Sequence, residues 1–143
     1  MIEIRRSAIV GHSPAQMFDL VNDVEAYPRR FAWCNAAQVL TREDAALTAR
    51  LELRIAGLSQ EFTTRNTLDR PRCIAMQLVA GPFRQLAGSW EFAALGADGS
   101  KVALALDFDY SGGLMAPVMR VGFQKLADRM VDEFCREAER AYG

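Results

Sequence analysis

Apolar and polar residues alternate along most of the first 110 residues, and this period of two is typical of strands with one buried face. The alternation is most regular in residues 47–57, where Leu47, Leu51 and Ile55 share one face and charged residues occupy the other. Short turn segments between the runs indicate consecutive antiparallel strands, and Asp98-Gly99 predicts one hairpin turn. The predicted strands cover residues 1–10, a segment beginning at residue 35, and residues 47–57, 59–69, 72–79, 85–95 and 100–110.

Two regions have helical patterns instead. Ser13 and Gln16 form a capping-box pattern around Pro14, so a helix is predicted to begin there. Tyr27-Pro28 is expected to interrupt it, which gives two short helices over residues 14–31. Residues 114–142 place apolar side chains at steps of three and four, which predicts a long amphipathic helix of roughly 40 Å.

The order of elements is therefore a strand, two short helices, six strands and a long helix, all in one domain over residues 1–143. A curved sheet covered by a helix readily leaves a cavity between them. The inward positions are mostly apolar, but Thr64 and Asn66 are polar neighbours on one strand. Two alternatives remain open for this pair: it binds a polar group of a ligand, or its members bond to each other, to backbone or to water.

Composition narrows the class of protein. The chain has 143 residues and a formal net charge of -1, and half of its residues are hydrophobic. This balance is typical of a globular domain and argues against general nucleic-acid binding, so no DNA partner is expected. The sequence has neither a signal-peptide pattern nor a long apolar segment, and we expect a cytoplasmic protein.

Few residues offer catalytic or metal-binding chemistry. The three cysteines are far apart in sequence and are expected to be free thiols, and with one histidine no metal site is predicted. His12 is expected to be a turn residue with its ring in solvent or capping backbone. Asp107 and Asp109 are expected to be wet, which does not favour a role as a general acid. An enzyme is therefore the weaker interpretation.

Three separated blocks carry a resemblance to a known family: YPRRFAWC at residues 27–34, GPFRQLAGSWEF at 81–92 and DFDY at 107–110. They resemble, in the same order, blocks of the coenzyme Q-binding protein family within the START-like superfamily, which is also known as the polyketide cyclase/dehydrase and lipid transport superfamily. The resemblance implies an α+β helix-grip (START-like/Bet v 1-like) fold. In this fold a curved antiparallel sheet of about seven strands surrounds a long C-terminal helix, in the order β-α-α-β6-α.

The same resemblance implies a function. Mitochondrial members of the family assist coenzyme Q in respiration, and a bacterial branch comprises ribosome-association toxins that block joining of the ribosomal subunits. The expected function is non-enzymatic binding of ubiquinone or a related isoprenoid lipid in support of respiratory electron transport, with no cofactor other than such a bound lipid. One alternative is a ribosome-association toxin of a toxin–antitoxin pair that binds the large ribosomal subunit. A second is a polyketide cyclase/aromatase-like enzyme.

The expected ligand site combines the inward side chains with the long helix. The quinone ring is expected near Thr64 and Asn66, and Gly81-Pro82-Phe83 with Leu114-Met115 would form an apolar entrance. This entrance would allow transient contact with a membrane surface and a peripheral location at the inner membrane. The residues expected to bind the ligand are Trp33, Phe62, Thr64, Asn66, Met76, Phe83, Trp90, Phe108, Phe123, Leu126 and Met130.

For the ribosomal alternative, outward-facing arginines would contact RNA phosphates, to which guanidinium groups bind in a bidentate manner. The competing interpretation is a solvated strand face, on which Glu52, Glu61 and Asp69 form cross-strand pairs with the arginines. The arginines expected to contact ribosomal RNA are Arg50, Arg54, Arg65, Arg70, Arg72 and Arg84.

Overall fold

One antiparallel sheet forms the body of the protein, and its seven strands lie in the order β1-β7-β6-β5-β4-β3-β2. The computed structural model describes residues 1–143. The predicted alternation is confirmed, since Leu47, Leu53 and Ile55 are buried while Arg54 between them is exposed. The strands are β1 (Ile2–Val10), β2 (Cys34–Glu43), β3 (Ala46–Ile55), β4 (Leu58–Asp69), β5 (Cys73–Ala80), β6 (Phe83–Leu95) and β7 (Gly99–Tyr110).

The first helix, α1 (Pro14–Asn22), begins with the predicted capping box. The Ser13 hydroxyl accepts a hydrogen bond from the Gln16 backbone N–H at 3.2 Å, and the Gln16 side chain accepts one from the Ser13 N–H at 2.9 Å. The predicted break falls earlier than Tyr27-Pro28, at Asp23, and is followed by the short turn η1 (Val24–Ala26) and by α2 (Tyr27–Arg30). Pro28 lies in the first turn of α2, where its missing N–H has no helical partner to lose.

The hairpin between β6 and β7 turns at a different place from the one predicted. Leu95 pairs with Gly99, so the turn consists of residues 96–98. Gly96 supplies the left-handed conformation with a φ of 64°. The predicted turn at Asp98-Gly99 is therefore wrong in position: Gly99 begins β7.

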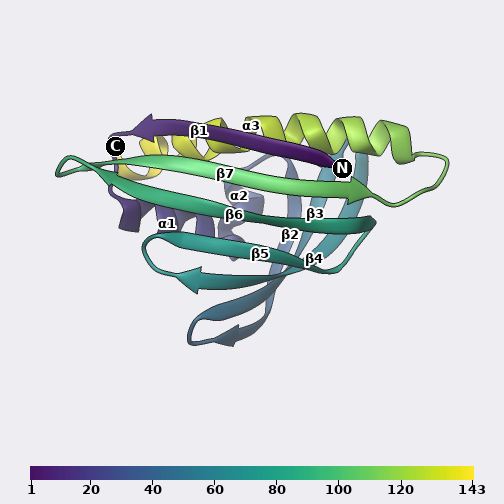
Figure 1. Cartoon of the computed structure of the whole chain (residues 1–143), viewed down its shortest axis with the longest axis horizontal. Coiled ribbons are helices and arrows are strands. Elements are labelled where there is room, and N and C mark those ends of the chain that lie inside the picture. The colour runs from purple at the N-terminus through teal and green to yellow at the C-terminus, as the bar shows by residue number, and fades with distance from the viewer.

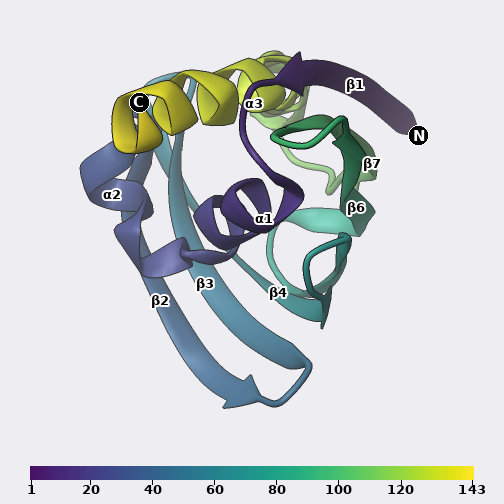
Figure 2. The same cartoon turned by 90° about the vertical axis from the view of Figure 1, so that its left-hand side faces the viewer.

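The long helix α3 (Ala116–Tyr142) runs along the sheet beside β1 (Figure 1). Seen from the end, the sheet curves around α1 and under α3 (Figure 2), so both helices face its concave side. Phe123 and Phe134 of α3 enter one core with Phe18 of α1 and Phe108 of β7. This architecture confirms the predicted helix-grip fold class.

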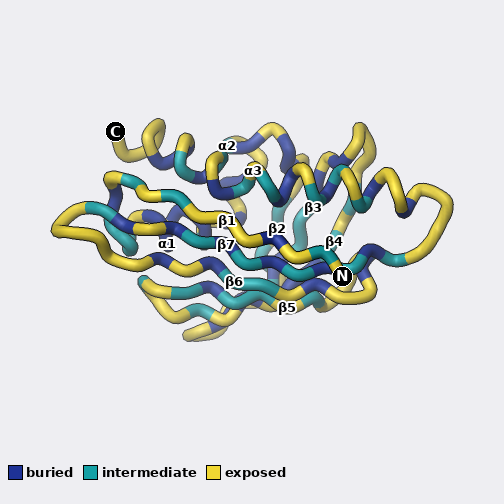
Figure 3. The backbone as a smooth tube through the Cα atoms, turned by 45° about the horizontal axis from the view of Figure 1, so that its top comes forward, coloured by how far each residue is buried: buried dark blue, intermediate teal, exposed yellow.

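Solvent exposure varies along α3 and along the loop that precedes it. The loop that joins β7 to α3 is exposed over residues 112–115, whereas buried and exposed residues alternate along the helix itself (Figure 3). None of the helices combines the length and the apolar character that crossing a membrane requires.

Candidate functional site

An apolar cavity lies between the concave face of the sheet and the helices. It has a volume of about 100 Å³, and 18 of its 20 lining residues are hydrophobic. Val21 contributes from α1, Phe62 from β4 and Phe134 from α3, so the lining joins segments from the whole length of the chain.

Most of the residues expected to bind a ligand meet in this cavity. Strand parity accounts for the strand residues, because inward positions of a curved sheet converge. The eight that line the cavity are Trp33, Phe62, Thr64, Asn66, Met76, Trp90, Phe123 and Met130.

Phe83, Phe108 and Leu126 do not line the cavity and are packed in the core. The rings of Phe83 and Phe108 lie 4.9 and 4.7 Å from that of Phe123, so an aromatic cluster fills this end of the sheet. Leu126 is 3% exposed and belongs to the same core. Parity predicts that a side chain points inward, but not how far along the sheet the open space extends.

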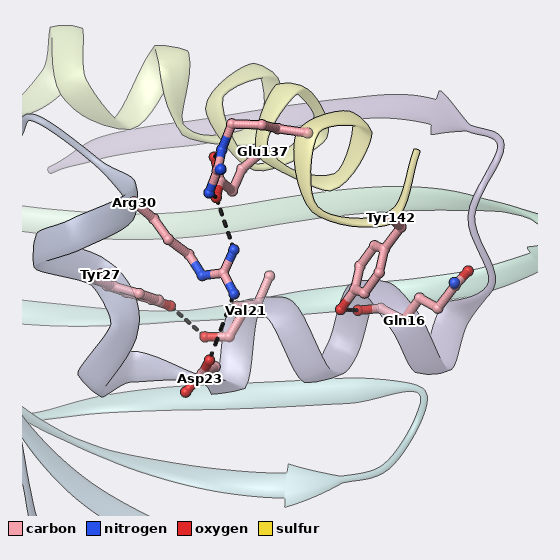
Figure 4. A network of polar contacts seen from close by, with 8 residues as sticks. Gln16, Val21, Asp23, Tyr27, Arg30, Glu137 and Tyr142 are labelled. Atoms are coloured by element: carbon pink, nitrogen blue, oxygen red, sulfur yellow. Dashed lines mark hydrogen bonds and ion pairs between the residues drawn. The ribbon is translucent and has the colours of Figure 1, made fainter.

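Sequence reasoning missed the wall that the short helices supply. Val21, Val24 and Tyr27 line the cavity, as does Phe134 of α3. The Tyr27 hydroxyl donates to the Val21 carbonyl (Figure 4), and burial raises the pKa of Tyr27 well above its usual range. The available signal is the apolar face of the first predicted helix, to which Val21 belongs.

Thr64 and Asn66 are the two polar residues among those on the strands of the cavity. The Thr64 hydroxyl donates to Asn66 Oδ1 at 2.9 Å, and both side chains are buried. Of the alternatives left open by the sequence, the structure thus shows the pair bonded to each other. Asn66 lies between Leu47 and Met76 on the neighbouring strands, so no polar side chain faces it across the sheet.

The size of the cavity limits what it holds without a change in shape. An engineered apolar cavity of about 150 Å³ admits benzene, and this cavity has about 100 Å³. A longer isoprenoid chain therefore requires the walls to move apart. Leu51, Phe62, Met76 and Met130 are lining residues that keep partial exposure.

The two halves of α3 are fastened differently. Residues 116–127 make no side-chain hydrogen bond or ion pair with the rest of the protein, so displacing this half breaks only apolar contacts. The second half makes five polar contacts, two of which are drawn in Figure 4. They join Asp128 to Arg6 (2.7 Å), Glu133 to the Trp33 indole N–H (3.1 Å), Glu137 to Arg30 (2.8 Å), Glu139 to His12 (3.1 Å) and the Tyr142 hydroxyl to the Gln16 carbonyl (3.1 Å).

Glu137 is the most buried carboxylate of this set, at 7% exposure. It accepts hydrogen bonds from Arg140 and from Arg30 of α2. These bonds, that from Arg140 first, lower the pKa of Glu137 against the opposing effect of burial. The negative charge thus holds α2 against the second half of α3.

The expectation that the His12 ring lies in solvent or caps backbone is wrong. The ring is 6% exposed, its Nε2 lies 3.1 Å from Glu139 Oε1, and it packs against Tyr142. The reason is the length of α3, whose last turns reach back to the loop between β1 and α1. The three cysteines are free, and burial raises the pKa of Cys34 to about 11.

The six arginines predicted to contact ribosomal RNA fall into two groups. Three form ion pairs with carboxylates, and we call them the paired arginines: Arg65 with Glu43, Arg70 with Asp19 and Arg72 with Asp69. The other three contact no carboxylate, and we call them the unpaired arginines: Arg50, Arg54 and Arg84.

The expected cross-strand pairs of Glu52, Glu61 and Asp69 with arginines are not formed. Glu52 lies directly opposite Glu61 on β4, and Asp69 bonds Arg72 within the following turn. The two-residue turn Ala56-Gly57, with φ values of 51° and 78°, fixes this register. Two like charges therefore face each other, a destabilising arrangement in a sheet.

The predicted entrance is exposed except at Pro82, which is half-buried, and at Phe83. Leu114 is 96% exposed and Met115 46%, whereas Phe83 is buried at 6%. The Ser111 N–H donates to the Pro82 carbonyl at 2.8 Å, which holds the two loops together.

The lining contains no Asp, Glu, His, Lys or Cys, and no group of three metal-ligating side chains occurs in the structure. Asp107 is half-exposed and bonds Arg5 at 2.8 Å on the outer face of the sheet. The cavity thus offers shape, apolar surface and a few hydrogen-bonding groups rather than acid–base chemistry.

Comparison with known proteins gives a consistent result. The sequence model of the polyketide cyclase / dehydrase and lipid transport family matches residues 10–135. The ribosome association toxin RatA of Pseudomonas aeruginosa is 44% identical over 140 residues, which cover 98% of this chain and 97% of that protein. The mitochondrial coenzyme Q-binding protein COQ10 homolog B of Xenopus laevis is 27% identical over 147 residues, covering 99% of this chain and 60% of that protein.

Among solved structures, the Zhui aromatase/cyclase from Streptomyces sp. R1128 superimposes with a TM-score of 0.88. The alignment covers 99% of this chain and 96% of that one at 18% identity, which shows a shared fold.

Proposed function

This chain belongs to the polyketide cyclase/dehydrase and lipid transport family, and we propose that it acts as a ribosome-association protein that binds the large ribosomal subunit and hinders subunit joining. The observation that carries the proposal is the 44% identity, over nearly the full length of both chains, to a protein named as a ribosome association toxin. Ribosome binding places the proposed activity in the cytoplasm.

The unpaired arginines are the groups that we propose to contact RNA. Arg50 and Arg54 donate to the side-chain amides of Gln38 and Asn35, neutral groups that leave the guanidinium charge available. The paired arginines would have to exchange a carboxylate for a phosphate, and this exchange gains less. Phosphate contacts release counterions, so binding should weaken as salt is raised.

Sucrose-gradient profiles of cells that express the chain test the proposal. We expect a lower ratio of 70S particles to free subunits with the wild-type chain. Replacing the three unpaired arginines with Gln should restore the ratio, whereas replacing the three paired arginines serves as the matched control and should restore it less. A profile that the wild-type chain leaves unchanged would contradict the proposal.

A second function is supported by the cavity itself. We propose that the cavity binds a hydrophobic ligand, ubiquinone or a related isoprenoid lipid being one candidate, without catalysing its conversion. The support is a space lined by 18 hydrophobic residues and by no Asp, Glu, His, Lys or Cys, next to a half-helix held by apolar contacts alone.

Organic extraction of the purified protein followed by mass spectrometry tests this second function. We expect a stoichiometric apolar compound in the extract. If none is found and added short-chain quinone does not bind, the cavity is not a ligand site.

A further inference from the structure

Two N–H groups in the cavity are left without protein acceptors. Five lining residues carry an N–H or O–H donor, and Tyr27, Trp33 and Thr64 donate theirs to protein oxygens. The Asn66 amide nitrogen and the Trp90 indole nitrogen donate to no protein group, although these residues are only 8% and 4% exposed. Neither nitrogen is among the fully buried polar atoms without a hydrogen-bond partner, which are Asn22 Oδ1, Arg30 Nε and Asp128 Oδ1. Each therefore keeps some accessible surface, at which a ligand or water can accept its hydrogen bond.

The surroundings of Asn66 explain why its amide N–H groups have no protein acceptor. The Thr64 hydroxyl donates a hydrogen bond to Asn66 Oδ1. This bond fixes the orientation of the Asn66 amide and leaves its NH2 group without a protein acceptor. On the flanking strands Asn66 faces Leu47 and Met76, and Thr64 faces Ala49 and Leu78. None of these four side chains offers an oxygen or nitrogen acceptor, and the Met76 thioether sulfur is only a weak acceptor.

The balance of donors and charges excludes several kinds of ligand. The lining has no cationic group, so a carboxylate would be buried without a counter-ion, which is strongly unfavourable. It has no anionic group to receive an ammonium ion. An alcohol oxygen can also accept from the amide N–H, but its own O–H must then share Asn66 Oδ1 with the Thr64 proton or bond to the Thr64 hydroxyl oxygen. A carbonyl oxygen needs donors alone.

We infer that Asn66, held by Thr64, selects uncharged ligands whose buried ring carries a carbonyl oxygen, and that its amide N–H donates to that oxygen. The inference rests on the proposed binding of a hydrophobic ligand and names the residue that determines which ligand fits. Trp90, whose N–H also lacks a protein acceptor, lines the same cavity. The volume of about 100 Å³ is smaller than the roughly 150 Å³ that admits benzene, so even a single ring enters only if the walls move apart.

Three probes of nine heavy atoms each test separately the need for a carbonyl oxygen and the exclusion of charge. Acetophenone carries a neutral carbonyl group, isopropylbenzene carries an alkyl group in its place, and benzoate carries a charged carboxylate. Titrations followed by 1H–15N NMR give the dissociation constants with the whole chain. We expect acetophenone to bind about tenfold more tightly than isopropylbenzene, and benzoate not to bind, since a buried hydrogen bond contributes about one order of magnitude. Asn66→Leu should abolish this preference, whereas Gln77→Leu, on the outer face of β5, should preserve it.

A second NMR measurement, made on the wild-type protein, keeps the test independent of how the variants fold. Acetophenone should shift the side-chain amide resonances of Asn66 strongly, and isopropylbenzene should not. If the two neutral probes bind equally in the wild type, or shift these resonances equally, the assignment of Asn66 is overturned while ligand binding stands. If none of the probes binds, both the assignment and the proposed ligand site are overturned.

Discussion

Two residues one turn apart on α3 distinguish a cavity wall from a packed core. Met130 lines the cavity and is partly exposed, whereas Leu126 does not line it and is 3% exposed. We predict that Met130→Ala lowers the free energy of unfolding less than Leu126→Ala. The reason is that Met130 already lacks neighbours on its cavity side.

The structure sets the expected size of the difference. Leu126→Ala removes packed methyl groups and leaves a new void, a change that lowers the free energy of unfolding by about 2–5 kcal/mol. Met130→Ala removes three heavy atoms, each contributing about 0.8 kcal/mol when fully buried, and partial exposure reduces their sum to about 1–2 kcal/mol. The adjoining space is open beforehand, so no further void is created.

Urea unfolding of both variants, followed by circular dichroism, measures the two losses on one scale. Met130→Phe extends the test, because a larger side chain should enter the cavity with little loss of stability, while Leu126→Phe should overpack the core and lose about 1–3 kcal/mol. If Met130→Ala proves as destabilising as Leu126→Ala, or Met130→Phe as destabilising as Leu126→Phe, the space beside Met130 is filled and the cavity assignment fails.

Three further outcomes follow from named contacts. A Cβ on Gly88 would lie 2.3 Å from the Ala105 carbonyl oxygen. Gly88→Ala should therefore lower the free energy of unfolding by about 1–3 kcal/mol, which a lower midpoint of thermal unfolding would reveal. The folded state lowers the pKa of Glu137, so the stabilisation by its charge is complete above the ordinary carboxyl pKa and is lost as the pH falls from there through the lowered pKa of the folded state. Between about pH 6 and about pH 3, Glu137→Gln should therefore lose less stability than the wild type, as measured by unfolding at each pH. The raised pKa of buried Cys34 predicts slow alkylation by iodoacetamide near pH 8, slower than that of half-buried Cys73, as peptide mass spectrometry would reveal; faster labelling of Cys34 would refute its burial.

The fold could be predicted from the sequence because the local patterns of its segments all indicate the same arrangement of strands and helices. Alternation identified the strand faces, and the Ser13–Gln16 capping box located the start of α1. These patterns do not determine positions that depend on a choice between neighbouring residues. The β6–β7 turn uses Gly96 rather than Gly99, and both glycines are compatible with the flanking pattern.

For the candidate site, the alternation along the strands predicts which side chains face inward, and nothing more. Asn66 and Met76 were identified as inward, but the depth of the cavity depends on how the Phe83, Phe108 and Phe123 rings fill one end of the sheet. The contacts of the second half of α3 were not foreseen, since they join residues about 100 or more positions apart, such as His12 and Glu139. No local pattern contains that information.

Binding of the purified protein to isolated, salt-washed ribosomal subunits tests the proposed function most directly. The chain should sediment with the large subunit and not with the small one, and the bound fraction should fall steeply as salt is raised, because RNA phosphates are the contacts. Replacing the unpaired arginines with Gln should reduce the bound fraction and flatten the salt dependence. A chain that remains at the top of the gradient at low salt, in the presence of either subunit, would contradict the account.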